Sequence, residues 1–592
     1  MLRINHERDA TGQYKLKTAL AAFALVIGLS AAAMAADSSQ AVGVPAAGTP
    51  PGTSLYVQLL QKAQPDECFV GIGSPENLYP ATMPCAQGIP KVNQGYIWGM
   101  TKAGQNLWYG TSANQLCTVI ASIFVQAGVQ PPPFESSNLV CEFSQSNYLV
   151  THPTVPPALG DWRPPEILMM DRTTNAVSNV TPDDPLIQQT LGIRAAGASN
   201  DIVLLGGPVL APFGMPAPGI NLFAFRNSTG KYLGSITLGQ YADIRIFIQY
   251  QGVLYVGVQN QDGSGSVLRW RGDGAHPFQF VEVGHVDNDA AYILVNRNRI
   301  FASTWGGMSS PSHQLSGLWV SPQIPVGGLT APSASHWKEI WRVDDFEPDP
   351  VTAQTILGGA LGSYNGFLYW GTMQVPMIGA LANISAYPRI PTPADLIETV
   401  IGTVRPDTIF RCCSSSVSKP NIRLMYGDAL LQVYNPMQGW QTEQNKMNAQ
   451  ALFGPAGFGN PFNVYTWSMA TYDNQLFVGT FDWSYVSSDL LDALMSALGI
   501  FDPTQIATIQ TLFGQYLAAS GATFGADLWR FKNNQGAFAE TQYGAGNYLN
   551  YGFRTMIADK RLFVGTANPM NLATNPVDAP LLGGFELLGM SP

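Results

Sequence analysis

Charged residues are scarce in this chain. Only 12% of its 592 residues are Asp, Glu, Lys or Arg, against roughly 25% in a typical soluble domain, and the acidic residues outnumber the basic ones by 40 to 30. The resulting formal charge of −10 repels phosphate backbones on average, so the composition argues against a nucleic-acid-binding protein. Hydrophobic residues make up 46% of the chain, which is enough to bury a large core and excludes a disordered polyelectrolyte.

Metal-binding patterns are also missing from the sequence. The chain has six His and six Cys, but no H-x-H, no pair of His at i, i+4 and no C-x-x-C. The sequence therefore gives no local support for a metal or nucleophilic site built on His, and we expect no cofactor. The segment 260–266 is oxygen-rich and bent by Gly, as in a Ca²⁺ loop, but it lacks the terminal Glu. A plain turn is the favoured interpretation there, and calcium is the weak alternative.

Long apolar runs are absent after the N-terminus, where a membrane-spanning helix would need about 18 such residues. The N-terminus itself has the pattern of an export signal. Lys15 and Lys17 precede an apolar run over 19–33, and Ala33-Met34-Ala35 gives the small-x-small cleavage pattern. We expect a signal peptide at 1–35 and a flexible Pro-, Gly- and Ser-rich segment at 36–53. The mature protein is then periplasmic or extracellular without a transmembrane segment; an anchor is the disfavoured alternative, because the apolar core is short.

All six Cys lie in the part of the chain that would be exported, and an oxidising compartment favours their pairing. We expect the disulfides Cys68–Cys85 and Cys117–Cys141, each closing a loop of modest length. Cys412 and Cys413 are adjacent, and they either form a strained vicinal bridge or stay reduced. Metal binding is the rival interpretation of the Cys.

A two-strand unit recurs along the chain. Near the C-terminus, the alternating runs 551–558 and 561–566 flank the two-residue turn Asp559-Lys560, which predicts a β-hairpin. The same unit recurs at 465–480 and 359–372, and weaker copies end near residues 111, 207, 258 and 304. Most copies are followed by a predicted third strand, for example 526–530 and, for the first copy, 139–143.

Seven such units of three or four antiparallel strands are what a β-propeller needs, because radial closure leaves only short sheet edges. In its Leu-Phe-Val-Gly-Thr repeats (476–480 and 562–566) and Leu-Trp-Arg repeat (528–530), the chain resembles the broad β-propeller superfamily, and in particular exported bacterial propellers of unassigned role. The resemblance covers about 96–588 and implies an all-β, seven-bladed propeller over 96–592, but no catalytic residues. The segment 54–95 precedes it, and its residues 55–60 can supply the outer strand of the last blade.

Insertions are expected on one face of the disc, because the connections between second and third strands are long while the opposite turns have two or three residues. The longest connection, 481–525, contains a helical pattern that ends at Gly499 and a second that begins at Asp502-Pro503 and reaches Ala519. We therefore expect a helical hairpin at about 488–519. It can be a packed lid, a ligand gate, or an apolar surface that docks to a partner or membrane.

Candidate binding residues map to the same face. They are Trp305, Phe481, Trp483 and Asn568 at or just after second-strand ends, and Trp467 and Arg554 at first-strand starts. Aromatic planes with an amide and one Arg suit a sugar or another amphipathic ligand, although propellers also use aromatics to fill space between blades. Arg554 is the strongest candidate. Counted from the repeat Gly, it is the only charged residue at its position, and a buried guanidinium needs a carboxylate or an anionic or hydroxyl-rich ligand.

Two classes of function fit these features. The favoured one is an exported binding module for a glycan, a cell-surface component or a protein partner. The alternative is a secreted hydrolase or lyase that uses carboxylates from several blades, with candidates at Asp287, Asp289 and 344–349. Two or more buried carboxylates in a pocket would favour the enzyme, and an aromatic-lined pocket without them the binding module.

Overall fold

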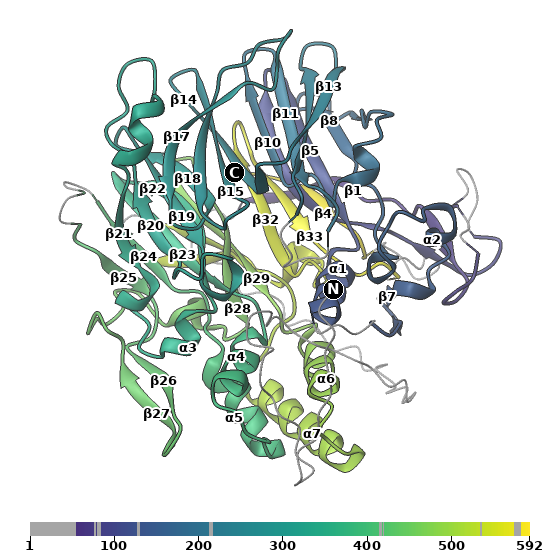
Figure 1. The fold of residues 1–592 in the computed structure, drawn as a ribbon, viewed down its shortest axis with the longest axis vertical. Coiled ribbons are helices and arrows are strands. Elements are labelled where there is room, and N and C mark those ends of the chain that lie inside the picture. The colour runs from purple at the N-terminus through teal and green to yellow at the C-terminus, as the bar shows by residue number, and fades with distance from the viewer. Residues whose placement is uncertain are drawn as a thin grey trace.

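A computed structural model describes residues 55–75, 78–79, 85–126, 131–211, 217–413, 417, 420–532, 535–572 and 582–592. The expected signal peptide and the segment 36–53 lie outside these residues. Figure 1 shows an arrangement dominated by strands, with helices gathered mainly at one end. No helix in the described part of the chain is long and apolar enough to cross a membrane.

Three of the sheets consist of four antiparallel strands that follow one another in chain order. Their strands are β10 (Ala195–Ser199), β11 (Ile202–Pro208), β12 (Ile220–Arg226) and β13 (Lys231–Leu238); β14 (Tyr241–Tyr250), β15 (Val253–Asn260), β16 (Gly265–Trp270) and β17 (Phe280–Val286); β18 (Asp289–Asn296), β19 (Arg299–Trp305), β20 (Gly317–Val320) and β21 (Lys338–Arg342).

The other long strands form further antiparallel runs of the same kind, which the single bridges Met373–Tyr465, Phe481–Gly552 and Ala567–Tyr96 join into one large sheet. These runs are β4 (Gln94–Ala103), β5 (Asn106–Ala113), β8 (Ile167–Asp171) and β9 (Val177–Asn179); β22 (Ile356–Tyr364), β23 (Phe367–Gln374), β24 (Ile409–Cys412) and β25 (Arg423–Tyr426); β28 (Asn463–Tyr472), β29 (Gln475–Asp482), β30 (Leu528–Phe531) and β31 (Ala537–Thr541); β32 (Gly552–Ala558), β33 (Leu562–Ala567), β34 (Glu586–Ser591) and β1 (Tyr56–Lys62).

The first strands of these runs contact one another in a closed cycle, from β4 through β10, β14, β18, β22, β28 and β32 back to β4. The fold is a β-propeller, in which the first strands surround the axis and each sheet packs against its neighbours. The strand β1, from the start of the described chain, pairs antiparallel with the last strand, β34. One sheet therefore contains both ends of the described chain.

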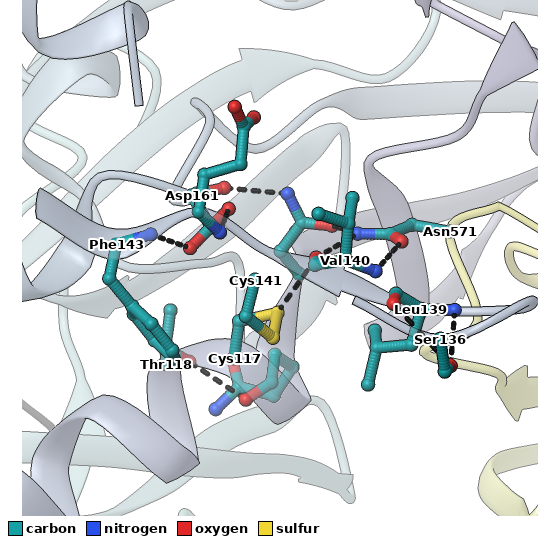
Figure 2. Close-up of a disulfide and its surroundings, with 12 residues drawn as sticks. Cys117, Thr118, Ser136, Leu139, Val140, Cys141, Phe143, Asp161 and Asn571 are labelled. Carbon is teal, nitrogen blue, oxygen red and sulfur yellow. Dashed lines mark hydrogen bonds between the residues drawn. A yellow bond between two sulfur atoms is a disulfide. The ribbon is translucent and has the colours of Figure 1, made fainter. Parts of the chain in front are cut away.

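The predicted third strand at 139–143 was wrong. β5 pairs with β8, whereas β7 (Val140–Cys141) pairs with β6 (Phe134–Glu135). The reason is visible in Figure 2: the disulfide Cys117–Cys141 ties β7 to helix α1 (Gln115–Gln126), and Asn571 exchanges two hydrogen bonds with the backbone of Val140, at 2.8 and 2.9 Å. Both contacts hold the segment away from the open edge of β5.

All six Cys are bonded. The pairs Cys68–Cys85 and Cys117–Cys141 are those expected from the sequence, and the neighbours Cys412 and Cys413 also form a bridge.

The helices follow the ends of second strands and so share one end of the propeller, which we call the loop face; in Figure 1 α4 to α7 lie at the lower end of the view, opposite the turns of β13 and β14. They are α4 (Ile378–Ala386) and α5 (Pro393–Thr403) between β23 and β24, and α6 (Ser487–Leu498) and α7 (Pro503–Ala519) between β29 and β30. Asp502 caps α7 by accepting hydrogen bonds from the backbone of Thr504 and Gln505.

Apolar residues of α6 and α7 pack inward. Leu491, Leu494, Ile509 and Phe513 are all buried, so they belong to the core under the loop face. The remaining helices and strands are short: α2 (Tyr148–Thr151), α3 (Pro350–Ala353), β2 (Glu67–Phe69), β3 (Ile89–Lys91), β26 (Leu430–Asn435) and β27 (Gly439–Gln444), with 3-10 turns η1 (Phe143–Gln145), η2 (Pro157–Leu159), η3 (Ile187–Gln189), η4 (Gly307–Ser309), η5 (Ala331–His336), η6 (Val343–Asp345), η7 (Ala456–Gly459) and η8 (Tyr543–Gly546).

Candidate functional site

Four of the six predicted site residues lie at the axis, namely Trp305, Trp467, Phe481 and Arg554, and the last three contact one another. The guanidinium of Arg554, on β32, lies 5.6 Å from the ring of Trp467, on the neighbouring first strand β28. Phe481, at the end of β29, packs edge-on against the same ring, with 5.2 Å between centroids. All three side chains are buried, and Arg554 is only 2% exposed.

β-Bulges set the orientation of the Trp467 and Arg554 side chains. The pairing of β28 with β29 skips Trp467, and the pairing of β32 with β33 skips Arg554, each beside the Gly of the Val-Gly-Thr repeat. An extra residue in one strand bends it and redirects that residue's side chain. The Gly is needed because the strands are close there: a Cβ on Gly565 would lie 2.4 Å from the Thr555 hydroxyl.

Two further arginines, which the sequence analysis missed, share this position. A bulge in β14 holds Arg245, and Arg194 directly precedes β10. Counting back from the repeat Gly gave Ala195 and Ile246, one residue further along. In the β32–β33 hairpin the residue paired with the repeat Gly, Thr555, is one position closer to that Gly along the chain than Ala195 is to Gly206 in β10–β11. A comparison that allowed a shift of one residue would have found both.

We call the resulting group the axial cluster. It contains Arg194, Arg245, Arg554, Asp243, Asp289, Tyr292, Trp305 and Trp467. Side chains cross the axis within it: the Tyr292 hydroxyl, on β18, donates a 3.1 Å hydrogen bond to the Trp467 carbonyl on β28, although β22 lies between these strands in the cycle. Some of the aromatic side chains therefore fill the axis.

The arginines of the cluster are held by few polar contacts. Arg194 forms an ion pair with Asp243. Arg245 donates a 3.2 Å hydrogen bond from Nε to the Ala291 carbonyl and lies 3.6 Å from the centre of the Trp305 ring. Trp305 is half-buried at the loop-face end of β19, and its indole N–H donates to the Gly358 carbonyl at 2.9 Å.

Several polar atoms of the cluster are buried without a hydrogen-bond partner among the described residues: Arg194 Nε, Arg245 Nη1, Arg554 Nε and Asp289 Oδ1. Arg554 also forms no ion pair with any of the described residues. Burial, together with the nearby positive charges of Arg245 and Arg194, lowers the pKa of Arg554 to about 9. Burial and the neighbouring Asp243 raise the pKa of Asp289 to about 7, against the opposing effect of Arg245 and Arg194.

The other two predicted site residues belong to the packing around the axis. Trp483 lies between Phe462 and Phe513 of α7, with ring centroids 5.3 and 6.5 Å away. Asn568 donates from its amide to the side-chain oxygen of Asn550, at 3.2 Å, and to the Leu582 carbonyl, at 2.6 Å. Their contacts support the loops next to the cluster.

A loop that occurs twice positions the strands that carry Trp467 and Arg554, and the sequence analysis did not identify it. Residues 457–463 and 544–550 both read Gly-x-Gly-Asn-x-x-Asn and lead directly into β28 and β32. The last Asn of each bonds back to the first Gly carbonyl, at 3.1 and 3.0 Å. The same amides donate to buried carboxylates, Asn463 to Asp527 at 2.9 Å and Asn550 to Glu586 at 2.7 Å.

The two loops differ in the charge that faces them. Glu586 forms a 3.1 Å ion pair with Lys62. Near the other loop, the buried Asp407, Asp482 and Asp527 have no ion pair among the described residues, and burial raises the pKa of the first two to about 7 and of Asp527 to about 6. No group of three or more His, Cys, Asp or Glu in the described ranges is arranged to hold a metal ion.

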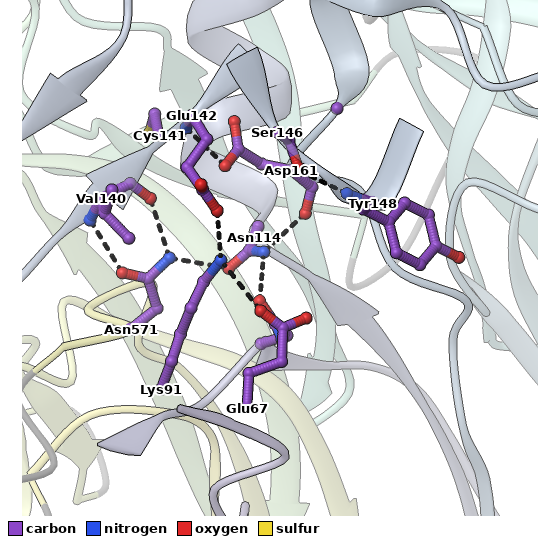
Figure 3. A network of polar contacts seen from close by, with 12 residues as sticks. Glu67, Lys91, Asn114, Val140, Cys141, Glu142, Ser146, Tyr148, Asp161 and Asn571 are labelled. Atoms are coloured by element: carbon purple, nitrogen blue, oxygen red, sulfur yellow. Dashed lines mark hydrogen bonds and ion pairs between the residues drawn. The ribbon is translucent and has the colours of Figure 1, made fainter. Parts of the chain in front are cut away.

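A separate pocket of about 330 Å³, which we call the side pocket, opens at the loop face above the run from β4 to β9. Asp66, Glu67, Glu166 and Arg163 are among its lining residues. Behind it, the fully buried Lys91 lies 3.3 Å from both Glu67 and Glu142, as Figure 3 shows. Burial favours the neutral form of Glu67, but Lys91 and Arg163 outweigh it and lower its pKa to about 2. Burial raises the pKa of Asp66 to about 7 and also raises that of Glu166.

No protein-family model and no curated protein matches the chain. Among solved structures, the chain is similar to the β-propeller domain of the Trilobed protease from Pyrococcus furiosus, with 7% identity and a TM-score of 0.28, over 76% of this chain and 98% of that one. It is also similar to an exo-β-1,3-galactanase from Phanerochaete chrysosporium solved with β-1,3-galactotriose, with 9% identity and a TM-score of 0.26 over 52% of this chain. The match spans 60% of the galactanase, and at these scores neither similarity bears on the ligand or reaction of this chain.

Proposed function

We propose that this chain is an exported, seven-bladed β-propeller that acts as a binding module for a glycan, a cell-surface component or a protein partner, with its ligand at the axial cluster. Each four-stranded run is one blade, and β1 completes the last blade beside β34. In this proposal, α6 and α7 are the helical hairpin over the loop face. The disulfides suit an oxidising compartment, which supports export.

One observation carries the proposed site: Arg554 is buried at the axis, and no carboxylate in the described ranges forms an ion pair with it. Burying an unpaired guanidinium costs free energy, so a fold that keeps one there is more readily explained by use than by stability. The rings of Trp305 and Trp467 add apolar planes on which a sugar ring can stack. Trp305 and Tyr465 are only half-buried, and both stand at loop-face ends of strands, which makes this face the entrance.

A glycan array probed with the mature protein tests this proposal, followed by titration of the best ligand. Arg554→Met and a deletion of 488–519 are compared with Arg561→Met, a change at the opposite end of the same blade. Loss of binding in the first two variants, with binding retained in the third, supports the site. Unchanged binding in both the Arg554 variant and the deletion, with the fold intact, refutes it.

A secreted hydrolase or lyase is the second candidate, because Asp243 and Asp289 come from two neighbouring runs and have unlike surroundings. Asp243 is paired with Arg194, whereas burial raises the pKa of Asp289 to about 7. A carboxylate and a carboxylic acid in one site is the arrangement of general base and general acid. Release of reducing ends from polysaccharides that is lost in Asp289→Asn would establish this function; equal release by the variant and the wild type would exclude it.

A further inference from the structure

We infer that the axial cluster recognises an anionic group on its ligand, namely the carboxylate of an acidic sugar, and that Arg245 and Arg554 bind it. This inference rests on the proposed function, because it assigns a ligand class to the same site.

The charges of the cluster are unbalanced. Of its three guanidinium groups, only Arg194 is paired with a carboxylate in the described structure. Arg245 contacts a backbone carbonyl and the rings of Trp305 and Tyr292, and Arg554 contacts the Trp467 ring. The cluster therefore carries at least one positive charge more than its carboxylates neutralise. An anion that entered it would gain from a low-dielectric setting that already excludes water.

A carboxylate fits the remaining donors better than a neutral hydroxyl does. Arg245 Nη1 and Arg554 Nε are buried donors without an acceptor in the described residues, and guanidinium groups hold carboxylates through paired, charge-assisted hydrogen bonds. Tyr292 and Trp467 connect the two arginines. The Tyr292 ring lies 5.2 Å from the Arg245 guanidinium, the Tyr292 hydroxyl donates to the Trp467 carbonyl, and the Trp467 ring lies 5.6 Å from the Arg554 guanidinium. Arg245 stacks against the ring of Trp305, and this ring is only half-buried. The sugar ring of a ligand whose carboxylate is bound by Arg245 can therefore lie next to Trp305.

Asp289 makes this recognition depend on pH. The charged groups that act on it are Asp243 and Arg245 from β14 and Arg194 from before β10. Arg554 from β32 and Tyr292 from β18 interact with these same arginines. When Asp289 ionises, its charge opposes a bound anion, so anion affinity falls as the pH rises through about 7. If only the protein with neutral Asp289 binds, affinity falls about 10-fold from pH 6 to pH 8.

The experiment is isothermal titration of the mature protein with glucuronate, with its uncharged amide glucuronamide, and with glucose. We expect glucuronate alone to bind measurably at pH 6, with affinity at least 10-fold above that of the amide. Arg554→Met reduces the glucuronate affinity about 10- to 100-fold, the range for one charge-assisted contact, while Arg561→Met leaves it unchanged. Asp289→Asn removes the pH dependence but keeps binding, a result that a purely structural role for Asp289 would not give.

Failure of this inference can be told from failure of the proposed function. If glucose or glucuronamide binds as well as glucuronate, and Arg554→Met still abolishes that binding, the axial site stands and anion recognition is overturned. Equal binding of phosphate or chloride and glucuronate overturns the sugar class. If Arg554→Met changes none of these affinities, both are refuted.

Discussion

Replacing Arg554 with Met should stabilise the ligand-free protein. Burial lowers the pKa of Arg554 from 12.5 to about 9, and each pKa unit corresponds to about 1.4 kcal/mol, so holding the charge in place costs about 5 kcal/mol at neutral pH. The variant also loses the contact between the guanidinium and the Trp467 ring, which offsets the gain in stability by about 1 kcal/mol. The flexible Met side chain can fill the space. A net gain of about 4 kcal/mol is expected.

Thermal unfolding at pH 7 measures this gain. With an unfolding entropy of about 2 cal/mol/K per residue, a chain of this length gains about 3 to 4 °C in Tm from about 4 kcal/mol. The folded pKa lies below the unfolded one, so the cost of the charge is complete below about pH 9 and shrinks as the pH rises towards 12.5. The Tm difference between variant and wild type should therefore be smaller at pH 10 than at pH 7, and Arg561→Met should show neither effect. A Tm below that of the wild type would mean that Arg554 stabilises the axis, and would refute the argument for its functional role.

Three further predictions concern the surroundings of the site. Replacing both Cys117 and Cys141 with Ser should lower the free energy of unfolding by about 3 kcal/mol, measured by denaturant titration; no loss would show that the bridge does not constrain the unfolded chain. Burial raises the pKa of Asp407 from its ordinary value of 3.8 to about 7, so the stability that its neutral carboxyl supplies is complete below about pH 4 and is lost as the pH rises through 7. The free energy of unfolding of Asp407→Asn, measured by thermal melts from pH 4 to 8, should fall by about 4 kcal/mol less than that of the wild type. The same dependence on pH in variant and wild type would contradict the raised pKa of Asp407. Asn550→Ala should cost about 1 to 3 kcal/mol, because it removes the hydrogen bonds to the Gly544 carbonyl and to Oε2 of Glu586, and should also weaken ligand binding at Arg554; calorimetry that finds full stability would contradict this role of the loop.

Local patterns in the sequence identified the strands and bridges that depend on near neighbours. The repeat ending at Thr566 predicts β32 and β33 because two alternating runs and a two-residue turn leave few other pairings. Asp502-Pro503 marks the start of α7 because the cap is formed by the residues themselves. The third strand at 139–143 failed because Asn571, far away in the chain, holds Val140 outside the blade.

The site could be predicted only in part from the sequence, because it too depends on contacts between residues that are far apart in the chain. Arg554 and Trp467 were found because each sits beside the residue that pairs with a repeat Gly. Arg194 and Arg245 were missed because the distance along the chain from the repeat Gly to this position differs by one residue between the hairpins. That Arg554 forms no ion pair within the part of the chain that the structure describes could not be read from the sequence, because it depends on which side chains cross the axis.

The most direct test of the account is a crystal structure of the mature protein with its best acidic-sugar ligand. We expect the ligand carboxylate within hydrogen-bond distance of Arg245 and Arg554, with the sugar ring against Trp305. A ligand bound instead in the side pocket, beside Asp66 and Glu166, would contradict it.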